Sequence, residues 1–404
     1  MTHPFVRRPV SGFSLIELMV SMAIALVLTI VIARVMIDSD ASKRTSTALN
    51  DANQNGAIAA YELDRLLRSS GSGFMQSWNA SNGNALGCLV RARLNNAIVL
   101  PRPTAFPAPF AATPQNVRLV PFVIMRAAGA TAADSDVLRV MGGNSGFAEV
   151  GRRIYGTTPN AATAAVPTAE SIRLINILGW KQDDLVLLTG AANGCTLQQV
   201  GTVPTGNTGQ ILTLGGPYAQ AGSNATVPLY DYAGGNTFAI HLGNISSEAT
   251  RNNPPDFRMY GVDTATASLV TYDMLQQTGN ALPIPIADSV VGMKAAYGID
   301  ANLDGVIDGD NSWVAPTGNY AGTEAALLSG SAAAQQLLRT IVAVRVALVV
   351  RSPLAEKNDV NPVSSLTLFA GSPAAITRTL TADEKKFRHR VVEITVPIRN
   401  MQFL

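Results

Sequence analysis

The sequence predicts an α+β protein in which one long N-terminal helix packs on a large, antiparallel β-rich region. Three observations lead to this fold class. An apolar run extends from Phe13 to Ile37, helical periodicity continues from there to Ser70, and short β-branched or alternating segments recur downstream between clusters of Gly, Pro and Asn. We therefore divide the chain into residues 1–12, 13–37, 38–72 and 73–404.

Residues 13–37 are predicted to form a transmembrane helix. Their only charged side chains are Glu17 and Arg34, and a bilayer core requires a helix of about 20 apolar residues. Arg7 and Arg8 precede this run without any acid, so the positive-inside bias keeps the N-terminus in the cytoplasm and exports the rest. The alternative is a cleaved secretory signal peptide, but its apolar region covers roughly 7–15 residues and ends at a small-x-small site, which does not follow this run.

Glu17 is an acid inside a membrane-length helix. A carboxylate near the bilayer centre costs about 2.5–3.5 kcal/mol, so we expect it to have a partner. Ser14 and Glu17 also have the S-x-x-E spacing of a capping box, which would explain an acid at any helix start. Capping does not explain the Gly12-Phe13 junction immediately before it.

Residues 38–72 are predicted to continue the helix outside the membrane. Gly56 is the only Gly or Pro between Asp38 and Ser70, and the sequence Gly71-Ser72-Gly73 then ends the helix. Small and apolar residues recur at helical spacing, which predicts one buried face. They are Leu49, Ala52, Ala59, Leu63, Leu66, Leu67 and Ser70.

Residues 73–404 are predicted to form antiparallel sheet with long loops and a second, alanine-rich helix over Glu324–Arg339. Whether they form one domain or two subdomains with a break near residue 280 stays open. The predicted strands are Val117–Met125, Asp136–Met141, Ser171–Ile177, Leu185–Leu188, Gln210–Leu214, Thr237–Leu242, Phe257–Tyr260, Ser268–Tyr272, Ser289–Tyr297, Ile341–Arg351, Ser365–Phe369 and Arg390–Ile398.

Composition argues against a nucleic-acid-binding protein and against an enzyme. Without residues 1–12, which hold two of the 30 basic residues, 28 basic residues face 28 acidic ones. The one dense basic stretch, Lys385–Arg390, follows Asp383 and Glu384 and is interpreted as a solvated loop rather than a phosphate-binding patch. The three histidines are scattered and no hydrolase, zinc-protease or Walker motif is present, so we predict no catalytic residues.

The two cysteines are Cys88 and Cys195. Export would deliver them to an oxidising compartment, where disulfides form and persist. We therefore predict a disulfide between them, with two unpaired buried thiols as the alternative.

Residues 300–308 are the strongest ligand-like pattern in the sequence. Oxygen-bearing side chains at positions 1, 3, 5 and 9, a Gly at position 6 and a main-chain carbonyl at position 7 follow the first part of an EF-hand calcium loop. The bidentate Glu of position 12 is missing, because Asn311 stands there. The alternatives are a structural Ca²⁺ site and an Asp/Gly-rich hairpin turn. The predicted ligands are Asp300, Asn302, Asp304, Val306 and Asp308.

The N-terminal sequence Gly12-Phe13-Ser14-Leu15-Ile16-Glu17 resembles the processing signal of type IV pilins and type II secretion pseudopilins. The resemblance implies a pilin-like fold, cleavage of the 1–12 leader after Gly12 by prepilin peptidase, and methylation of the new amine on Phe13. It also implies that Glu17 pairs with the N-terminus of a neighbouring subunit in the filament. The protein would start as a single-pass inner-membrane protein with a periplasmic C-terminal domain and then enter a surface pilus.

Scattered later segments resemble PilW-type minor pilins. The resemblance implies a non-enzymatic role in initiating type IV pilus assembly, in a tip or priming complex, and hence in twitching motility. Partners would be other minor pilins, the major pilin, prepilin peptidase and the inner-membrane assembly platform. A J-like type II secretion pseudopilin and a pilus-tip adhesin or DNA-uptake subunit are the alternatives. The segments are 54–71, 87–88, 183–188, 195–200, 297–300, 344–351 and 396–400.

Overall fold

The structure is a computed structural model, and it confirms the α+β class: one long apolar N-terminal helix and a large, mainly antiparallel β-rich region. The chain separates into two units, residues 1–51 and 52–404. The described residues are 12, 14–74, 85–145, 151–158, 170–190, 194–203, 210–220, 237–277, 282–356, 359–360 and 363–401.

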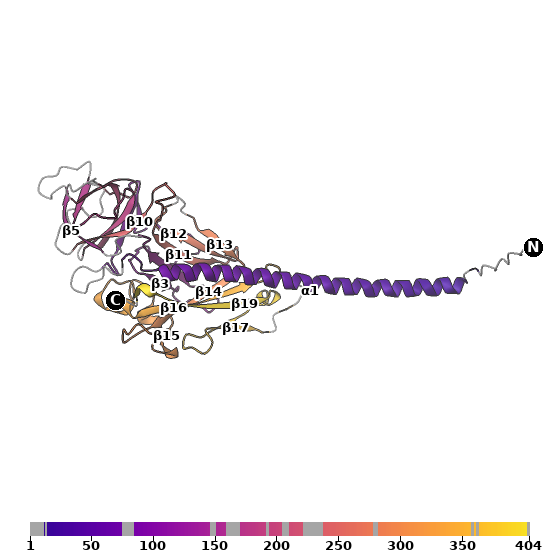
Figure 1. Ribbon diagram of the computed structural model, residues 1–404. Coiled ribbons are helices and arrows are strands. Elements are labelled where there is room, and N and C mark those ends of the chain that lie inside the picture. Colours follow the sequence, from indigo (N-terminus) through magenta and orange to yellow (C-terminus); the bar gives the residue numbers. More distant parts are fainter. Residues whose placement is uncertain are drawn as a thin grey trace, which may run out of the picture. The chain divides into compact units, whose positions relative to one another are not determined.

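Helix α1 runs from Leu15 to Ser69 (Figure 1), close to the predicted helix 13–70. Phe13 lies outside the described residues. After the helix, Gly71 adopts a φ of 79°, a left-handed conformation that suits Gly and ends the helix as predicted.

The largest sheet contains eight described strands in the order β2-β1-β8-β7-β10-β5-β6-β9. All its pairings are antiparallel except that of β1 with β8, which is parallel and was not predicted. The strands are β1 (Val90–Leu94), β2 (Ala97–Leu100), β5 (Arg152–Thr158), β6 (Glu170–Leu174), β7 (Asp184–Gly190), β8 (Gly194–Thr202), β9 (Ile211–Leu214) and β10 (Phe238–Asn244).

Two further sheets contain five and four described strands, in the orders β13-β12-β11-β4-β3 and β15-β14-β16-β19, and a two-stranded ribbon joins β17 to β18. Their bounds are β3 (Phe122–Met125), β4 (Val137–Gly142), β11 (Asp256–Asp263), β12 (Ser268–Asp273), β13 (Ile284–Asp288), β14 (Val290–Ile299), β15 (Trp313–Val314), β16 (Ile341–Arg351), β17 (Ser365–Leu368), β18 (Ile376–Thr379) and β19 (His389–Pro397). The short 3-10 helices are η4 (Asp310–Ser312), η5 (Gly318–Tyr320), η6 (Glu384–Lys386) and η7 (Arg399–Met401).

The second helix is shorter than predicted: α2 spans Ala332–Arg339 instead of beginning at Glu324. Gly330 has a φ of 73°, which interrupts a helix, and Ser331 then acts as the N-cap. The Ser331 hydroxyl accepts a hydrogen bond from the Ala334 N–H at 3.2 Å. The prediction was wrong at this end because the cap outweighs the alanine-rich composition before it.

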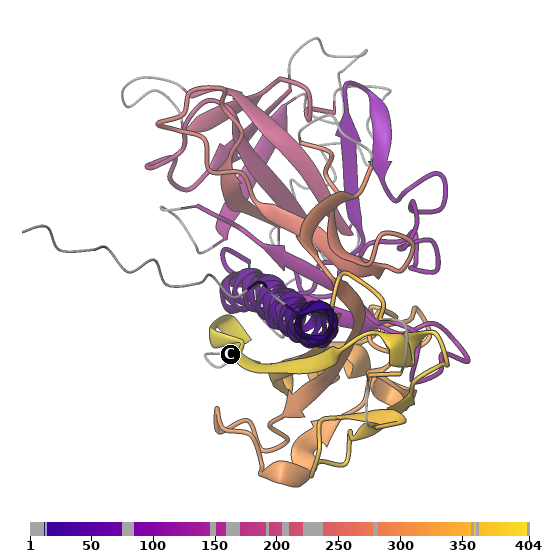
Figure 2. The same ribbon diagram turned by 90° about the vertical axis from the view of Figure 1, so that its right-hand side faces the viewer.

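The last turns of α1 belong to the core of the unit 52–404. Figures 1 and 2 show this part of the helix between strands β11 and β12 on one side and β14, β16 and β19 on the other. Ala59, Leu63 and Leu67 are buried. A Cβ placed on Gly56 would meet Val392 and Val350 at 3.1 and 3.2 Å, so the helix lies directly against β16 and β19 at this point.

A buried carboxylate joins the five-stranded and four-stranded sheets. Both oxygens of Asp136, just before β4, accept hydrogen bonds from Arg126 at 2.7 Å. From β14, the Ala295 N–H donates to Asp136 at 2.9 Å, and the Lys294 ammonium lies 3.7 Å away. Burial lowers the pKa of Lys294, and the charge of Asp136 opposes this shift. The two sheets are therefore held together by a fully partnered buried charge.

Candidate assembly site

The head of α1 is capped by Ser14 and Glu17, and the Glu17 contact is that of a capping box. The Ser14 N–H donates to Glu17 Oε2 at 3.1 Å, and the Ser14 hydroxyl accepts from the Ile16 N–H at 3.4 Å. The Leu18 N–H donates to the Ser14 carbonyl at 3.1 Å and starts the helical ladder. These contacts satisfy N–H groups that lack helical partners at a helix start. Gly12 lies two residues before Ser14 in the sequence, and Phe13, the predicted new N-terminus, is outside the described residues.

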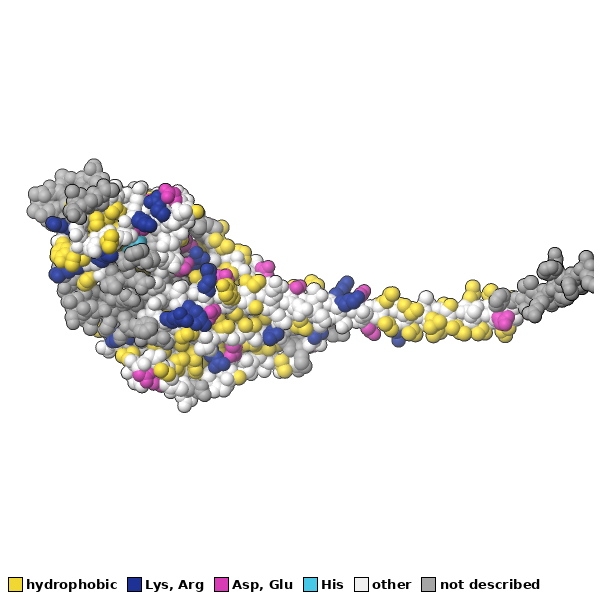
Figure 3. Space-filling model, in the orientation of Figure 1, with side chains coloured by type: hydrophobic (Ala, Val, Ile, Leu, Met, Phe, Trp, Pro, Cys, Tyr) yellow, Lys and Arg dark blue, Asp and Glu magenta, His cyan; other side chains and the backbone are white. Residues whose placement is uncertain are grey.

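The apolar stretch that follows Glu17 is exposed throughout. Its large apolar side chains between Leu15 and Ile37 are 49–77% exposed, and Figure 3 shows hydrophobic side chains along this part of the helix. The helix contains an 18-residue window that is apolar enough to cross a membrane. This stretch therefore requires an apolar environment from outside the chain, either lipid or other helices.

Within that stretch, Glu17 can do more than cap the helix. An ionised carboxylate offers about four lone-pair sites, and the N–H of Ser14 uses one of them. An ammonium group from another chain could occupy the others. The capping and pairing interpretations of Glu17 are thus compatible in geometry.

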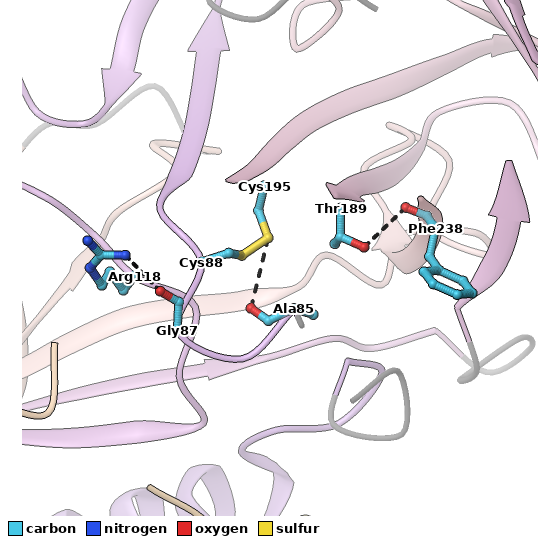
Figure 4. The surroundings of a disulfide bond; sticks show 7 residues. All are labelled: Ala85, Gly87, Cys88, Arg118, Thr189, Cys195 and Phe238. Carbon is cyan, nitrogen blue, oxygen red and sulfur yellow. Dashed lines mark hydrogen bonds between the residues drawn. A yellow bond between two sulfur atoms is a disulfide. The ribbon is translucent and has the colours of Figure 1, made fainter. Parts of the chain in front are cut away.

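The predicted disulfide between Cys88 and Cys195 is confirmed (Figure 4). The Cα atoms lie 5.7 Å apart, within the usual range for a disulfide. The bond links the segment before β1 to strand β8, where Val90 pairs with Cys195 in parallel register. Arg118 donates to the Gly87 carbonyl at 2.9 Å beside it. The disulfide therefore fastens the parallel pair among the described strands of the large sheet.

The predicted calcium loop follows β14, and its own Asp side chains accept hydrogen bonds from its main-chain N–H groups. Asp300 is buried and accepts hydrogen bonds from the N–H groups of Asp304 and Gly305 at 3.2 and 2.7 Å. Asp308 accepts from the Ala301 N–H at 2.7 Å. Within the described part of the chain, no group of three or more His, Cys, Asp or Glu side chains is placed to hold a metal ion. Calcium binding stays a prediction, beside a turn that is already satisfied by hydrogen bonds.

The basic stretch before β19 is paired with acids and with α1. Lys386 lies 2.9 Å from Asp383, and Arg388 lies 3.1 Å from Glu356. Arg390 donates to the Asn53 side chain of α1 at 2.8 Å. These contacts fit the interpretation as a solvated, charge-paired loop that also borders the helix.

Sequence reasoning missed the Asp136 cluster. The sequence predicts Asp136 as the first residue of a strand, and nothing near it in sequence indicates its contact with Ala295 in β14. The ten-residue separation of Arg126 and Asp136 across the β3–β4 hairpin is the one signal that could have suggested an ion pair.

Two family models match this chain. Residues 259–400 match the model described as type IV pilus-assembly protein W, and residues 7–33 match the prokaryotic N-terminal methylation motif. The first match covers most of β11 and all of the chain from β12 to β19, including the loop 300–308. The second covers Gly12, Glu17 and most of the apolar stretch. No curated protein and no solved structure matches the chain.

Proposed function

Because this chain is a type IV pilus minor pilin of the PilW type, we propose that it is trimmed after Gly12, enters the filament through α1, and helps to initiate pilus assembly. Its place would be a tip or priming complex with other minor pilins. Its role would be structural, as expected for a family of pilus-assembly proteins.

The observation that carries this proposal is the single acid, Glu17, at the head of an exposed apolar helix. Cleavage after Gly12 would create an α-ammonium on Phe13, whose charge complements this carboxylate. In an apolar surrounding, each charge alone is costly, and two that satisfy each other are much less so. An ammonium from one subunit and Glu17 of the next would therefore set the axial position of adjacent helices.

The same features support a path through the inner membrane. Arg7 and Arg8 would hold the N-terminus in the cytoplasm, residues 13–37 would span the bilayer, and the remainder would lie in the periplasm before assembly. The disulfide between Cys88 and Cys195 suits that oxidising compartment. Prepilin peptidase, the assembly platform and the major pilin would be the partners along this path.

A J-like type II secretion pseudopilin would share the N-terminal motif. The match of residues 259–400 to a pilus-assembly family favours the pilus over the secretion system. A secretion defect with normal pili in a strain lacking the protein would reverse this preference.

The test is deletion of the gene, followed by counting surface pili. We expect most pili to be lost and to return with the wild-type gene. We expect Glu17→Ala and Glu17→Gln to reach the membrane in normal amount, with Phe13 as the mature N-terminus by mass spectrometry, and yet to restore few pili. Normal piliation of the deletion strain would contradict the proposed function, and normal piliation with Glu17→Ala would contradict charge pairing.

A further inference from the structure

Strands β5, β6 and β9 carry a row of exposed side chains on their outer face. Arg173 of β6 pairs with Gly156 of β5 and with Ile211 of β9. The register of β5 shifts between Ile154 and Gly156, which makes Tyr155 the extra residue of a β-bulge. Bulges re-aim side chains, and here Tyr155 is 55% exposed beside a strand residue, Ile154, that is buried.

The row borders a surface hollow. Tyr155, Arg173, Leu174, Ile175 and Gln210 line a space of about 510 Å³, which is in the size range of binding pockets. Ile175 is 54% exposed at its edge. We call Arg153, Tyr155, Arg173, Ile175 and Ile211 the β5–β6–β9 face. Figure 3 shows hydrophobic and basic side chains together at the margin where Figure 1 labels β5.

The face rests on a buried core. Ile154, Ile172 and Leu174 belong to a separate buried core beneath it. Arg152 donates to the Asn176 carbonyl at 2.8 Å, which fixes the loop after β6, and burial lowers the pKa of Arg152. The Asn176 side chain in turn accepts from the Leu178 N–H at 2.7 Å. A surface ordered in this way loses little conformational entropy when a partner binds.

The basic side chains of this face have no acidic partner among the described residues. The Arg153 guanidinium lies 5.9 Å from the centre of the Tyr155 ring. Among the residues that the structure describes, neither Arg153 nor Arg173 has a carboxylate partner, in contrast to the ion pairs of the basic stretch before β19. Arg binds carboxylates through two parallel hydrogen bonds, so the face is complementary to an acidic group.

We propose that the β5–β6–β9 face docks a second protein subunit that presents carboxylates around an apolar side chain. Tyr and Arg, together with Trp, are enriched among the residues that contribute most to protein–protein binding energy. The exposed aliphatic side chains Ile175 and Ile211 favour a protein surface over a saccharide or a nucleic acid, which offer few aliphatic groups to pack on them. This inference rests on the proposed function, because the partner would be another pilus subunit.

The test places a photo-crosslinking p-benzoylphenylalanine at Tyr155 in the full chain, in cells that make pili. The same residue at Leu354, which is exposed elsewhere on the unit, is the control. We expect Tyr155 to crosslink to a pilus subunit at a site next to Asp or Glu, identified by mass spectrometry. Arg173→Glu should lower the yield about tenfold, Arg173→Lys should lower it less, and Lys385→Glu outside the face should leave it unchanged.

Reversing the identified partner acid to Lys should restore the crosslink of the Arg173→Glu variant, which a merely misfolded variant would not allow. A crosslink only to saccharide, lipid or nucleic acid, no crosslink, or a yield unchanged by Arg173→Glu would overturn docking. If the deletion strain lacks pili but the Arg153→Glu/Arg173→Glu variant restores them fully, the docking face is wrong and the proposed function stands. If the deletion strain keeps its pili, the proposed function fails whatever Tyr155 crosslinks to.

Discussion

The two halves of α1 are both rich in apolar residues, yet their surroundings differ. From Leu15 to Ile37 the large apolar side chains point in all directions and are exposed. From Ala52 to Ser69 one stripe of apolar and small residues is buried, although Ile58 and Tyr61 are 43% and 66% exposed, and other positions carry ion pairs such as Arg68 with Asp64 at 2.7 Å. The distribution of apolar residues around the helix therefore indicates its environment better than their number does.

One carboxylate in each unit, Asp136 and Glu17, shows the same contrast between buried and exposed surroundings. Asp136, in the unit 52–404, is completely buried and receives hydrogen bonds from Arg126 and Ala295. Glu17, in the other unit, accepts a hydrogen bond from the N–H of Ser14 at the helix start. The Asp136 cluster is thus complete within its own unit. Under the proposed function, the head of α1 becomes complete only with a second chain.

The largest expected effect tests this comparison within one helix. Leu63→Ala removes a fully buried side chain and should lower the free energy of unfolding of the β-rich unit by about 2–5 kcal/mol. The matched change Leu26→Ala, at a residue that is 63% exposed, should leave it unchanged. Chemical denaturation of the full-length protein in detergent measures both. Equal losses would show that the apolar stretch also supports the β-rich unit.

The second prediction concerns the disulfide that links the segment before β1 to strand β8. The disulfide closes a sequence separation of 107 residues, and replacing Cys88 and Cys195 by Ala should lower the stability of the β-rich unit by about 2–4 kcal/mol. Insertion of residues 13–37 into the membrane should be unaffected, because these residues lie outside the loop that the disulfide closes. Wild-type protein under strong reductant should reproduce the loss. A variant as stable as the oxidised wild type would contradict a stabilising role for the bond.

Much of the fold follows from local pattern. Helix α1 was predicted within two residues at each end, and β16 has the predicted bounds Ile341–Arg351 because its apolar, β-branched run is uninterrupted. Strand β8 was missed because Gln198 and Gln199 resemble a polar loop. Both are buried, and their amides bond to Gln220 and Asp183. Such partners are distant in sequence, so no local pattern could predict the strand.

The candidate functional residues also fall into two groups, those with a local sequence signal and those that depend on tertiary contacts. A motif and a lone charge in the sequence single out Gly12 and Glu17, whose roles stay predictions, and the compartment argument predicts the disulfide that the structure contains. The Asp136 cluster and the β5–β6–β9 face were not found, because they depend on β14 reaching the end of β3–β4 and on the bulge at Tyr155. Pairing across sheets and bulge position come from tertiary packing, which one sequence does not display.

A smaller effect is expected at the loop 300–308, within the stretch that matches the pilus-assembly family. If the loop binds Ca²⁺, the wild type should gain thermal stability when Ca²⁺ replaces chelator, and Asp304→Ala should remove that gain. The Asp304 carboxylate also accepts from the Val306 N–H at 2.9 Å. A loss that is equal in chelator and in Ca²⁺ would therefore identify the hairpin turn as its only role.

The smallest expected effect is pH dependence at the start of β19, the strand that packs on Gly56 of α1. Burial lowers the pKa of His389 below its ordinary 6.5, although the nearby Phe387 carbonyl and Glu384 oppose this. The unfolded chain therefore takes up a proton first as the pH falls through 6.5, and the contribution of neutral His389 to stability is lost below that value. The melting temperature of the wild type should fall more between pH 7.5 and pH 5.5 than that of His389→Gln, which cannot titrate.

The apolar stretch from Leu15 to Ile37 contains no histidine, so helix insertion should not change over the same range. Equal pH dependence of the two proteins would assign the effect to other groups.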